Sequence, residues 1–338
     1  MKAAVLRAPG ELKVEEVETP GLPPGGLLLR TRICALCSTD LHMIDHGERD
    51  LVLPRIIGHE FVGEVVGSDA LGFEPGMVVQ LYPGIACGTC RSCRRGMHNH
   101  CENGLVYGFD HHGGMAGYVS VPRASVFIGG VNPIPDGMRD DVAVLAEPLS
   151  CCINAQGPTP VETVIICGGG PMGCIHAILA RLNGAKTVAI IESFPSRAEM
   201  AWRTGVDSVL PPEDHEREVE RLTGGRGADL IVLATNGMEV NEVLPLLAHR
   251  GRVCVFSNPR DRGERLCLSK DLMFYRENAV FGSFGSTSAQ CREAMGMLEA
   301  ESDRFGWIIS CKAHIDDLEA AMEHMRQRKG LKAAVDRF

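Results

Sequence analysis

The sequence lacks an excess of positive charge, and it also lacks long apolar runs. Its 34 lysines and arginines are outnumbered by 43 aspartates and glutamates, which gives a net charge of -9. Because nucleic acids and anionic membranes attract basic surfaces, this balance disfavours both as partners. A membrane-spanning helix needs about 18 or more consecutive apolar residues, and no such stretch occurs. We therefore expect a small-molecule partner.

A secretory signal pattern is also missing from the start of the sequence. Residues 1–8 have neither a basic start nor the apolar core of a signal peptide, and they run into the alternation typical of a strand. We therefore expect the cytoplasm, where thiols stay reduced. The chain has 338 residues, of which 45% are hydrophobic, so it is long enough to fill two cores without disulfides.

The organisation of the sequence changes near residue 150. Up to about residue 141, short β-branched runs are interrupted by glycine and proline, as at 19–21 and 23–26, which predicts an antiparallel, barrel-like domain. From residue 161 onward, apolar strands alternate with helical segments. This alternation predicts a doubly wound parallel sheet, because each parallel strand pair needs a crossover connection. The six expected strands are 164–167, 187–191, 207–210, 230–234, 252–256 and 280–283.

These patterns predict an α/β chain with three segments. We expect residues 1–150 to form the barrel-like domain, residues 151–286 to form the parallel-sheet domain, and residues 287–338 to return to the first domain. In the last segment, an amphipathic stretch at 289–299 and the end at 308–338 do not continue the strand–helix alternation.

A glycine pattern is the first chemical motif. Gly168, Gly170 and Gly173 form G-x-G-x-x-G directly after the first strand of the alternating part, and Pro171 and Met172 lie inside it at the start of a helical segment. Such a turn lets the backbone and the positive end of a helix approach a pyrophosphate. We therefore expect these residues to bind a dinucleotide.

An acidic residue near this motif indicates which dinucleotide binds. Glu192 ends the second expected strand, nineteen residues past the last glycine, where a carboxylate binds the ribose hydroxyls of NAD and repels the extra phosphate of NADP. NAD is favoured, although Glu192 as a solvated strand end and Arg197 as a phosphate ligand stay open as alternatives. Ser257 and Ser283 follow the fifth and sixth expected strands, at ends where such sheets hold ligands, so we expect cofactor contacts there.

Four of the fourteen cysteines form the second motif. Cys87, Cys90, Cys93 and Cys101 fall within fifteen residues. Four thiolates complete a tetrahedral zinc shell and leave no position for water, which predicts a structural zinc site. The alternatives are a reduced cysteine-rich loop or another closed centre such as iron–sulfur.

A third set of residues predicts a different kind of metal site. Cys37 opens the segment Cys-Ser-Thr-Asp-Leu-His, His59 and Glu60 follow about twenty residues later, and Glu147 lies near the expected domain boundary. A thiolate, an imidazole and a carboxylate make a three-ligand zinc site with an open position, which is what catalysis needs. The alternative is that His59 is an ordinary histidine with no metal.

Together these motifs resemble the zinc-containing medium-chain alcohol dehydrogenase family, and within it the sorbitol and threonine dehydrogenase branch. The resemblance runs from Met1–Ala4 to Lys332–Val335. It implies a GroES-like antiparallel barrel as the catalytic domain and a Rossmann nucleotide domain. It also implies NAD and two zinc ions per chain, one catalytic and one structural.

The resemblance further implies roles for individual residues. Cys37 and His59 are catalytic zinc ligands, Glu60 ligates or exchanges with water, and Glu147 is a carboxylate near or on the metal. The choice between Glu60 and Glu147 as third ligand stays open.

Three residues near Cys37 take part in the implied chemistry without binding the metal. Asp40 orients His59, Thr39 takes the substrate proton, and His42 relays that proton to solvent. An ordinary histidine stays the alternative for His42.

The expected reaction is hydride transfer between NAD and a secondary alcohol such as a polyol, a cyclitol or an amino alcohol. Ser38 stands where many ethanol-type enzymes have a basic residue, which points away from simple ethanol dehydrogenases. Met43 stands where polyol enzymes often have an aromatic residue, which argues against sorbitol dehydrogenase itself. The particular alcohol is therefore not assigned. Alternatives are an L-threonine 3-dehydrogenase, a zinc-free NADPH-dependent reductase of the same fold, and a non-catalytic NAD-binding structural protein. The resemblance also implies a homo-oligomer, tetramer or dimer, with the strand at 280–283 as a pairing edge.

Overall fold

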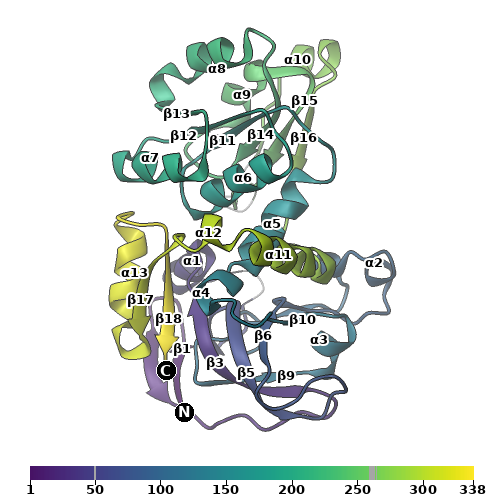
Figure 1. Ribbon diagram of the computed structural model, residues 1–338, viewed down its shortest axis with the longest axis vertical. Helices are drawn as coiled ribbons and strands as arrows, with labels where there is room; N and C mark the ends of the chain where they lie inside the picture. Colours follow the sequence, from purple (N-terminus) through teal and green to yellow (C-terminus); the bar gives the residue numbers. More distant parts are fainter. Residues whose placement is uncertain (49–50, 259–262, 264) are drawn as a thin grey trace. The chain divides into compact units, whose positions relative to one another are not determined.

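The computed structural model describes residues 1–48, 51–258, 263 and 265–338. The chain forms two compact units, the first made of Met1–Ser150 with Ser286–Phe338 and the second of Cys151–Gly285 (Figure 1). Within the described part of the chain, no helix combines the length and apolar character needed to cross a membrane.

The first unit is built on antiparallel strands. Its largest sheet has the order β10-β6-β5-β3-β18-β17, with β9 also paired to β3, and a smaller sheet has the order β2-β1-β4. The strands are β1 (Lys2–Leu6), β2 (Leu12–Glu16), β3 (Leu27–Ala35), β4 (Arg55–Ile56), β5 (Glu60–Ser68), β6 (Val78–Leu81), β7 (Gly84–Ile85), β8 (Leu105–Val106), β9 (Tyr118–Val121), β10 (Val131–Pro133), β17 (Ile309–His314) and β18 (Lys332–Arg337). The helices are α1 (Ser38–His46), α2 (Arg91–Arg94), η1 (His98–His100), α3 (Arg123–Phe127), α4 (Asp140–Ala143), α5 (Ala146–Gln156), which continues into the second unit, α11 (Ser288–Ala300), α12 (Ser302–Phe305), η5 (Ile315–Asp317) and α13 (Leu318–Arg326).

Strand β3 shows why this sequence forms a sheet with one covered face. Leu27, Leu29, Thr31 and Ile33 are buried, whereas the arginines between them are exposed, which is the period of two that a half-buried strand requires. At the end of β3 the alternation stops, and the chain stays buried up to the residue before Cys37. The strand therefore delivers Cys37 to the interior of the unit.

The second unit is a six-stranded parallel sheet with the order β13-β12-β11-β14-β15-β16. Its strands are β11 (Thr163–Cys167), β12 (Thr187–Ile191), β13 (Ser208–Leu210), β14 (Ala228–Leu233), β15 (Leu247–Val255) and β16 (Ala279–Gly282). Its helices are α6 (Pro171–Leu182), α7 (Pro195–Ala201), η2 (Trp202–Thr204), η3 (Pro212–Asp214), α8 (His215–Thr223), α9 (Val240–Val243), η4 (Leu244–Leu246) and α10 (Lys270–Tyr275).

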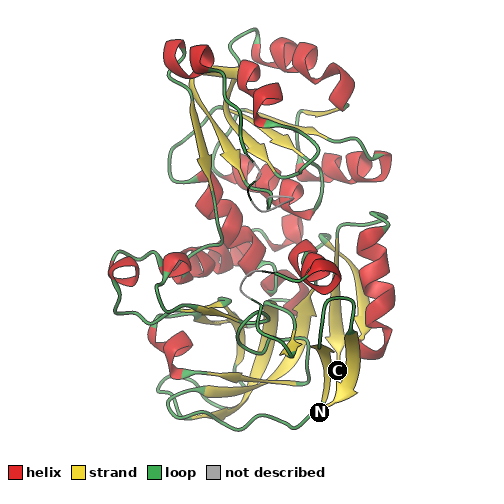
Figure 2. Ribbon diagram, turned by 180° about the vertical axis from the view of Figure 1, so that it is seen from behind, coloured by secondary structure: helices red, strands yellow, loops and turns green. Residues whose placement is uncertain are grey.

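This sheet is buried on both faces. Val164 and Ile166 of β11 belong to the core that includes α6, while Ile165 and Cys167 belong to the core that includes α8 and α9. Figure 2 shows red helices on both sides of these yellow strands. The predicted doubly wound sheet and the barrel-like antiparallel unit are therefore confirmed.

Two differences from the sequence predictions exceed the shifts of one or two residues seen at other strand ends. Strand β15 begins five residues earlier than expected, because its first half includes the exposed residues His249 and Arg250, which an apolar pattern does not mark. The expectation that the last segment lacks strand–helix alternation is wrong, because β17 and β18 are parallel and α13 connects them. Strand β17 contains both apolar and polar residues, so it lacks the continuous apolar run by which the other parallel strands were predicted.

Candidate metal centres and cofactor site

The register of the large sheet brings three distant segments of the first unit together. Ala35, at the end of β3, pairs with Glu60 at the start of β5. On its other side, Ala35 pairs with Ala334 of β18. Cys37, His59 and Lys332 each lie within two residues of these paired positions. The site is therefore a consequence of strand pairing.

A thiolate, an imidazole and a carboxylate converge at this point. The ligand atoms of Cys37, His59 and Glu60 all lie within 4.8 Å of one another. His59 is 7% exposed and Glu60 is 1% exposed, so two of the three side chains are buried. Glu60 Oε2 has no hydrogen-bond partner among the described residues. Since a buried carboxylate oxygen needs a partner, this orphaned atom and the donor set fit a metal ion such as zinc.

Asp40 fixes two of these groups. One of its oxygens, Oδ2, accepts a hydrogen bond of 2.8 Å from the backbone N–H of Cys37, and Oδ1 lies 3.2 Å from Nδ1 of His59. A carboxylate on one ring nitrogen leaves the other nitrogen for a metal and sets the ring orientation. Asp40 is fully buried, so this contact is shielded from solvent.

The charges in this cluster shift the pKa values of its members. Burial raises the pKa of the Cys37 thiol, but hydrogen bonding with His59 and the charge of Lys332 outweigh burial and lower this pKa to about 7. Burial also lowers the pKa of His59, but the pKa is raised overall because Asp40 and Cys37 favour its cation. For Glu60, burial is the largest cause and raises the pKa of the carboxyl group, although the charge of Lys332 opposes it.

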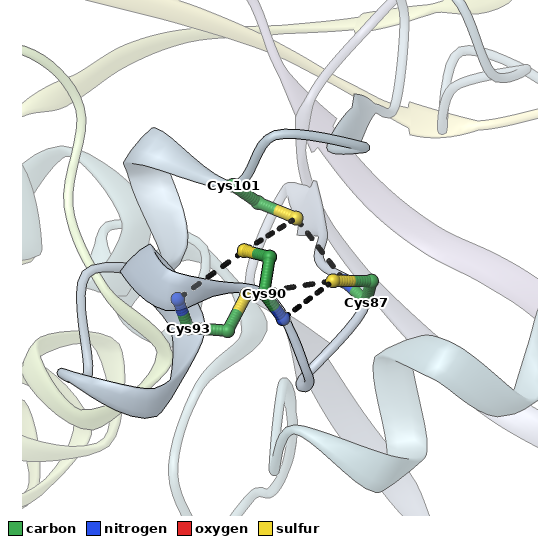
Figure 3. A group of neighbouring side chains, drawn as sticks. All are labelled: Cys87, Cys90, Cys93 and Cys101. Atoms are coloured by element: carbon green, nitrogen blue, oxygen red, sulfur yellow. Dashed lines mark hydrogen bonds between the residues drawn. The ribbon is translucent and has the colours of Figure 1, made fainter.

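The four clustered cysteines form a second, separate group. The ligand atoms of Cys87, Cys90, Cys93 and Cys101 also lie within 4.8 Å of one another, and their side chains converge in Figure 3. Backbone N–H groups point at the sulfurs, for example from Cys90 to Cys87 Sγ at 3.3 Å and from Cys93 to Cys90 Sγ at 3.4 Å. These N–H groups help to stabilise thiolates, and those of Thr89 and Cys90 lower the pKa of Cys87 to about 5.

This loop also contacts another part of the first unit. Nδ1 of His98 lies 3.0 Å from the hydroxyl of Ser288, the first residue of α11. His98 is therefore a structural contact, and it is absent from the cysteine group.

The glycine motif of the second unit forms the expected turn. It joins β11 to α6, and Gly168 has a φ of 104°, which favours glycine. A Cβ on Gly173 would lie 1.8 Å from the carbonyl oxygen of Gly168, so no side chain fits there. Gly170 is the N-cap of α6, and Pro171 and Met172 begin the helix. Such a helix N-terminus attracts a phosphate group.

Glu192 lies against this turn. It is 8% exposed, so it is not a solvated strand end. Its carboxylate accepts hydrogen bonds of 2.7 Å from the backbone N–H groups of Gly169 and Phe194. A Cβ on Gly170 would lie 3.4 Å from Nη1 of Arg197, which places this guanidinium beside the same turn.

Ser257 and Ser283 follow β15 and β16, at the carboxyl ends of neighbouring strands. The N–H of Ser257 donates to the carbonyl of Leu233, and the hydroxyl of Ser283 accepts a hydrogen bond of 3.2 Å from Asn154. Both serines are half-buried. They lie in the same unit as the glycine turn, as expected for a ligand-binding edge.

Comparisons with known proteins agree with this geometry. Residues 23–134 match the model "Alcohol dehydrogenase GroES-like domain", and residues 171–300 match "Zinc-binding dehydrogenase". An L-threonine 3-dehydrogenase of Pyrococcus horikoshii is 34% identical over 242 residues, which cover 69% of this chain and 68% of that protein. The chain belongs to the zinc-dependent medium-chain alcohol dehydrogenase family.

Further relatives match nearly the whole chain. A D-altritol 5-dehydrogenase of Agrobacterium fabrum is 30% identical and matches over 91% of both chains. A solved zinc-binding dehydrogenase of Sinorhizobium meliloti 1021, bound to NADP, is 28% identical with a TM-score of 0.88 and covers 99% of this chain and 98% of its own. The resemblance inferred from the sequence motifs is thus confirmed.

The structure also places three further residues expected in the dehydrogenase site. Thr39 Oγ1 lies 3.5 Å from Cys37 Sγ. His42 is three residues further along α1, is exposed, and has its ring centroid 5.1 Å from that of His46. Glu147 is buried on α5 but is outside the group of three ligand atoms, although its charge contributes to raising the pKa of Glu60.

Sequence reasoning missed one residue of the dehydrogenase site. Nζ of Lys332 lies 2.7 Å from Oε1 of Glu60, and the side chains of the two residues are 2% and 1% exposed. The charges of Glu60 and Cys37 outweigh burial and raise the pKa of this lysine. One signal in the sequence could have indicated this residue: Lys332 is a single lysine inside the apolar run 331–335. Because lysine is almost never buried without a partner, a lysine in a buried strand predicts an acidic partner nearby.

Proposed function

We propose that this dehydrogenase oxidises a secondary alcohol and transfers the hydride to NAD. The observation that carries the proposal is the convergence of Cys37, His59 and Glu60 with one buried carboxylate oxygen left unpartnered. This set offers three ligands, which is typical of catalytic rather than structural zinc sites. Zinc held there would supply the Lewis acidity that lowers the pKa of a substrate hydroxyl.

We infer that Glu60, rather than Glu147, is the third ligand. Glu60 is in the group of close ligand atoms and Glu147 is not. The four cysteines at 87, 90, 93 and 101 would hold a second zinc ion with a purely structural role, because four thiolates leave no open position.

Three residues of α1 would orient a ligand and move the proton. Asp40 holds the ring of His59 through Nδ1. Thr39, beside Cys37, would accept the hydroxyl proton of the substrate, since its own hydroxyl both accepts and donates. His42 lies three residues later on the same helix and is exposed, so it suits the passage of that proton to solvent.

The second unit would bind NAD, which supplies the hydride acceptor. The turn from Gly168 to Gly173 would hold the pyrophosphate, with Arg197, Ser257 and Ser283 as further contacts. The buried carboxylate of Glu192 would accept hydrogen bonds from the ribose and would disfavour a 2′-phosphate. We therefore propose NAD rather than NADP, although the Sinorhizobium meliloti relative was solved with NADP.

The substrate class is a polyol, a cyclitol or an amino alcohol. The relatives include both an L-threonine 3-dehydrogenase and a D-altritol 5-dehydrogenase, so L-threonine is the second candidate. Over nearly the full length of the chain, an L-threonine 3-dehydrogenase of Bacillus licheniformis is 28% identical and the altritol enzyme is 30% identical, which favours neither.

We also propose that the enzyme acts in the cytoplasm as a homo-oligomer, a dimer or tetramer. All fourteen cysteines are free, as is typical of a reducing compartment. The terminal strand β16 is an open edge of the second unit's sheet, which suits pairing with another copy.

The proposal is tested by NADH formation across a panel of polyols, cyclitols and amino alcohols, together with metal analysis. Wild-type protein should hold two zinc ions per chain. Cys37→Ala and His59→Ala should abolish turnover while NADH binding stays nearly intact, because the glycine turn lies in the other unit. Cys267→Ala, at an exposed cysteine of the second unit, is the matched control.

Retained turnover in Cys37→Ala or His59→Ala would refute the zinc mechanism. If no alcohol in the panel yields NADH with the wild-type protein, the result would favour the non-catalytic alternative.

A further inference from the structure

The ion pair between Lys332 and Glu60 joins the last strand of the chain to the candidate metal centre. The pair is 2.7 Å long and nearly inaccessible to solvent. An isolated buried charge is costly, and each partner favours the charged form of the other, so Lys332 opposes the rise that burial causes in the pKa of Glu60. Among the described residues, Nζ of Lys332 donates its hydrogen bond to Glu60, and the charge of Lys332 also lowers the pKa of Cys37. Its direct contact is therefore with Glu60, whereas its effect on Cys37 is one of charge.

The two oxygens of Glu60 have different surroundings. Oε1 accepts the hydrogen bond from Nζ of Lys332, whereas Oε2 is buried and has no partner among the described residues. A carboxylate can bind a metal ion through one oxygen or through both. An ammonium group on Oε1 engages one lone pair of that oxygen and attracts its negative charge, which makes Oε2 the better-placed oxygen for the metal.

The backbone of Lys332 is held firmly in place. Its N–H donates to the carbonyl of Ile308, and its own carbonyl accepts a hydrogen bond from the hydroxyl of Ser310. Two residues later, Ala334 pairs with Ala35 of β3. Lys332 and Glu60 are thus held by strands of the same sheet. Strand pairing therefore determines that the ammonium group contacts Oε1 of Glu60.

We propose that Lys332 restricts Glu60 to binding the metal through one oxygen and thereby keeps a coordination position open for the substrate. This inference rests on the proposed function, because it requires a metal at Cys37, His59 and Glu60. Lys332 is a positioning residue, since it acts through Glu60 and touches neither substrate nor cofactor in this scheme.

Two substitutions separate this role from simple charge compensation. Lys332→Met has a similar volume and frees Oε1, so both oxygens of Glu60 can reach the metal and fill the open position. Lys332→Arg keeps the charge, but its planar guanidinium can bind both oxygens of Glu60 and withdraw Oε2 from the metal. The first variant should keep the metal, and the second should bind it less tightly.

The experiment uses the full-length protein with zinc in the cysteine group and cobalt(II) in the catalytic position. The visible absorption of cobalt(II) reports its coordination number, and azide serves as a probe of the open position. For Lys332→Met we expect unchanged metal content, weaker absorption typical of a higher coordination number, and azide affinity reduced about 10- to 100-fold. For Lys332→Arg we expect metal affinity, measured by competition with a chelator, to fall by about 10- to 100-fold.

Lys312→Met is the matched control. It removes another lysine of the same sheet, which pairs with Asp141 at 2.5 Å and is 42% exposed. This variant should match the wild type in spectrum, azide binding and metal affinity.

Wild-type spectrum and azide affinity in Lys332→Met would overturn the inference, because Lys332 would then only compensate a charge. Unchanged metal affinity in Lys332→Arg would also overturn it, and this measurement decides the question if Lys332→Met does not fold. If the wild-type protein binds a metal only at its cysteine group, the proposed function itself fails, which is a distinguishable result.

Discussion

Glu192 links the backbone of the glycine turn to the choice of cofactor. Its two oxygens already accept hydrogen bonds from the N–H groups of Gly169 and Phe194, so the carboxylate is held against the turn. A phosphate on the neighbouring ribose would meet a fixed, buried negative charge. Arg197 lies beside the same turn and offers the opposite charge. The balance between these two side chains should decide between NAD and NADP.

Glu192→Ser should shift the cofactor preference toward NADP. Without the carboxylate, the guanidinium of Arg197 is left to attract the 2′-phosphate. We expect the ratio of kcat/KM for NADP to that for NAD to rise about 100-fold, which corresponds to about 2.7 kcal/mol. Glu162→Ser removes an exposed carboxylate that pairs with Lys186 in the same unit, and it should leave the ratio unchanged. An unchanged ratio in Glu192→Ser would contradict the proposed role.

At the scale of single residues, what could be predicted depended on the type of side chain. Cysteine, histidine and glutamate at ligand spacing are rare enough to be recognised without a structure, so the candidates Cys37, His59 and Glu60 were found. Lys332 was not found as a site residue, because lysine is usually a surface residue. Its position depends on strand pairing between residues almost three hundred positions apart, which no local pattern contains.

At the scale of elements, the cysteine loop shows how a segment with little regular structure is stabilised. Around it the chain forms only the short helices α2 and η1 and the two-residue strands β7 and β8. Few apolar side chains of the loop are buried, so its order should depend on the metal that the four cysteines hold. The spacing of the cysteines predicted this group. The contact of His98 with Ser288 of α11 could not be predicted in this way, because the two residues are far apart in the sequence and no local pattern links them.

Cys90→Ser should therefore reduce stability rather than chemistry. Loss of one thiolate weakens the structural zinc site, and each kcal/mol lost lowers the melting temperature by about 2–4 °C in a domain of this size. We expect zinc content to fall to one ion per chain and the melting temperature to drop, while activity per folded molecule stays near that of the wild type. The control is Cys267→Ser, an exposed cysteine in the other unit. Loss of activity in the fully folded variant would show that the loop serves the chemistry directly.

At the scale of the whole molecule, strand alternation was enough to predict two kinds of sheet. The parallel sheet was predictable because both of its faces are buried, so its strands are continuous apolar runs. The antiparallel unit was predictable only as a class, because the order β10-β6-β5-β3-β18-β17 joins strands from both ends of the chain. Such long-range pairing depends on the whole fold and has no signature in a short window.

The open edge of the parallel sheet bears on the assembly of the enzyme. Strand β16 ends the sheet, and all four of its residues are exposed or half-buried. The side chains of Phe274, Tyr275 and Phe284, close to it in sequence, are 71%, 76% and 65% exposed. Unpaired strand edges next to exposed aromatic side chains are typical of surfaces that bind another chain. A second copy, pairing edge to edge across a two-fold axis, would cover this surface.

Sedimentation at micromolar concentration should therefore detect a dimer or tetramer. Ala279→Lys places a charge at an exposed position of β16, and a two-fold axis would bring two such charges close together, so the equilibrium should shift toward monomer. Ala289→Lys, at an exposed position of α11 in the other unit, should leave the assembly unchanged. A wild-type monomer would refute the homo-oligomer, whereas an oligomer that persists in folded Ala279→Lys would place the interface away from β16.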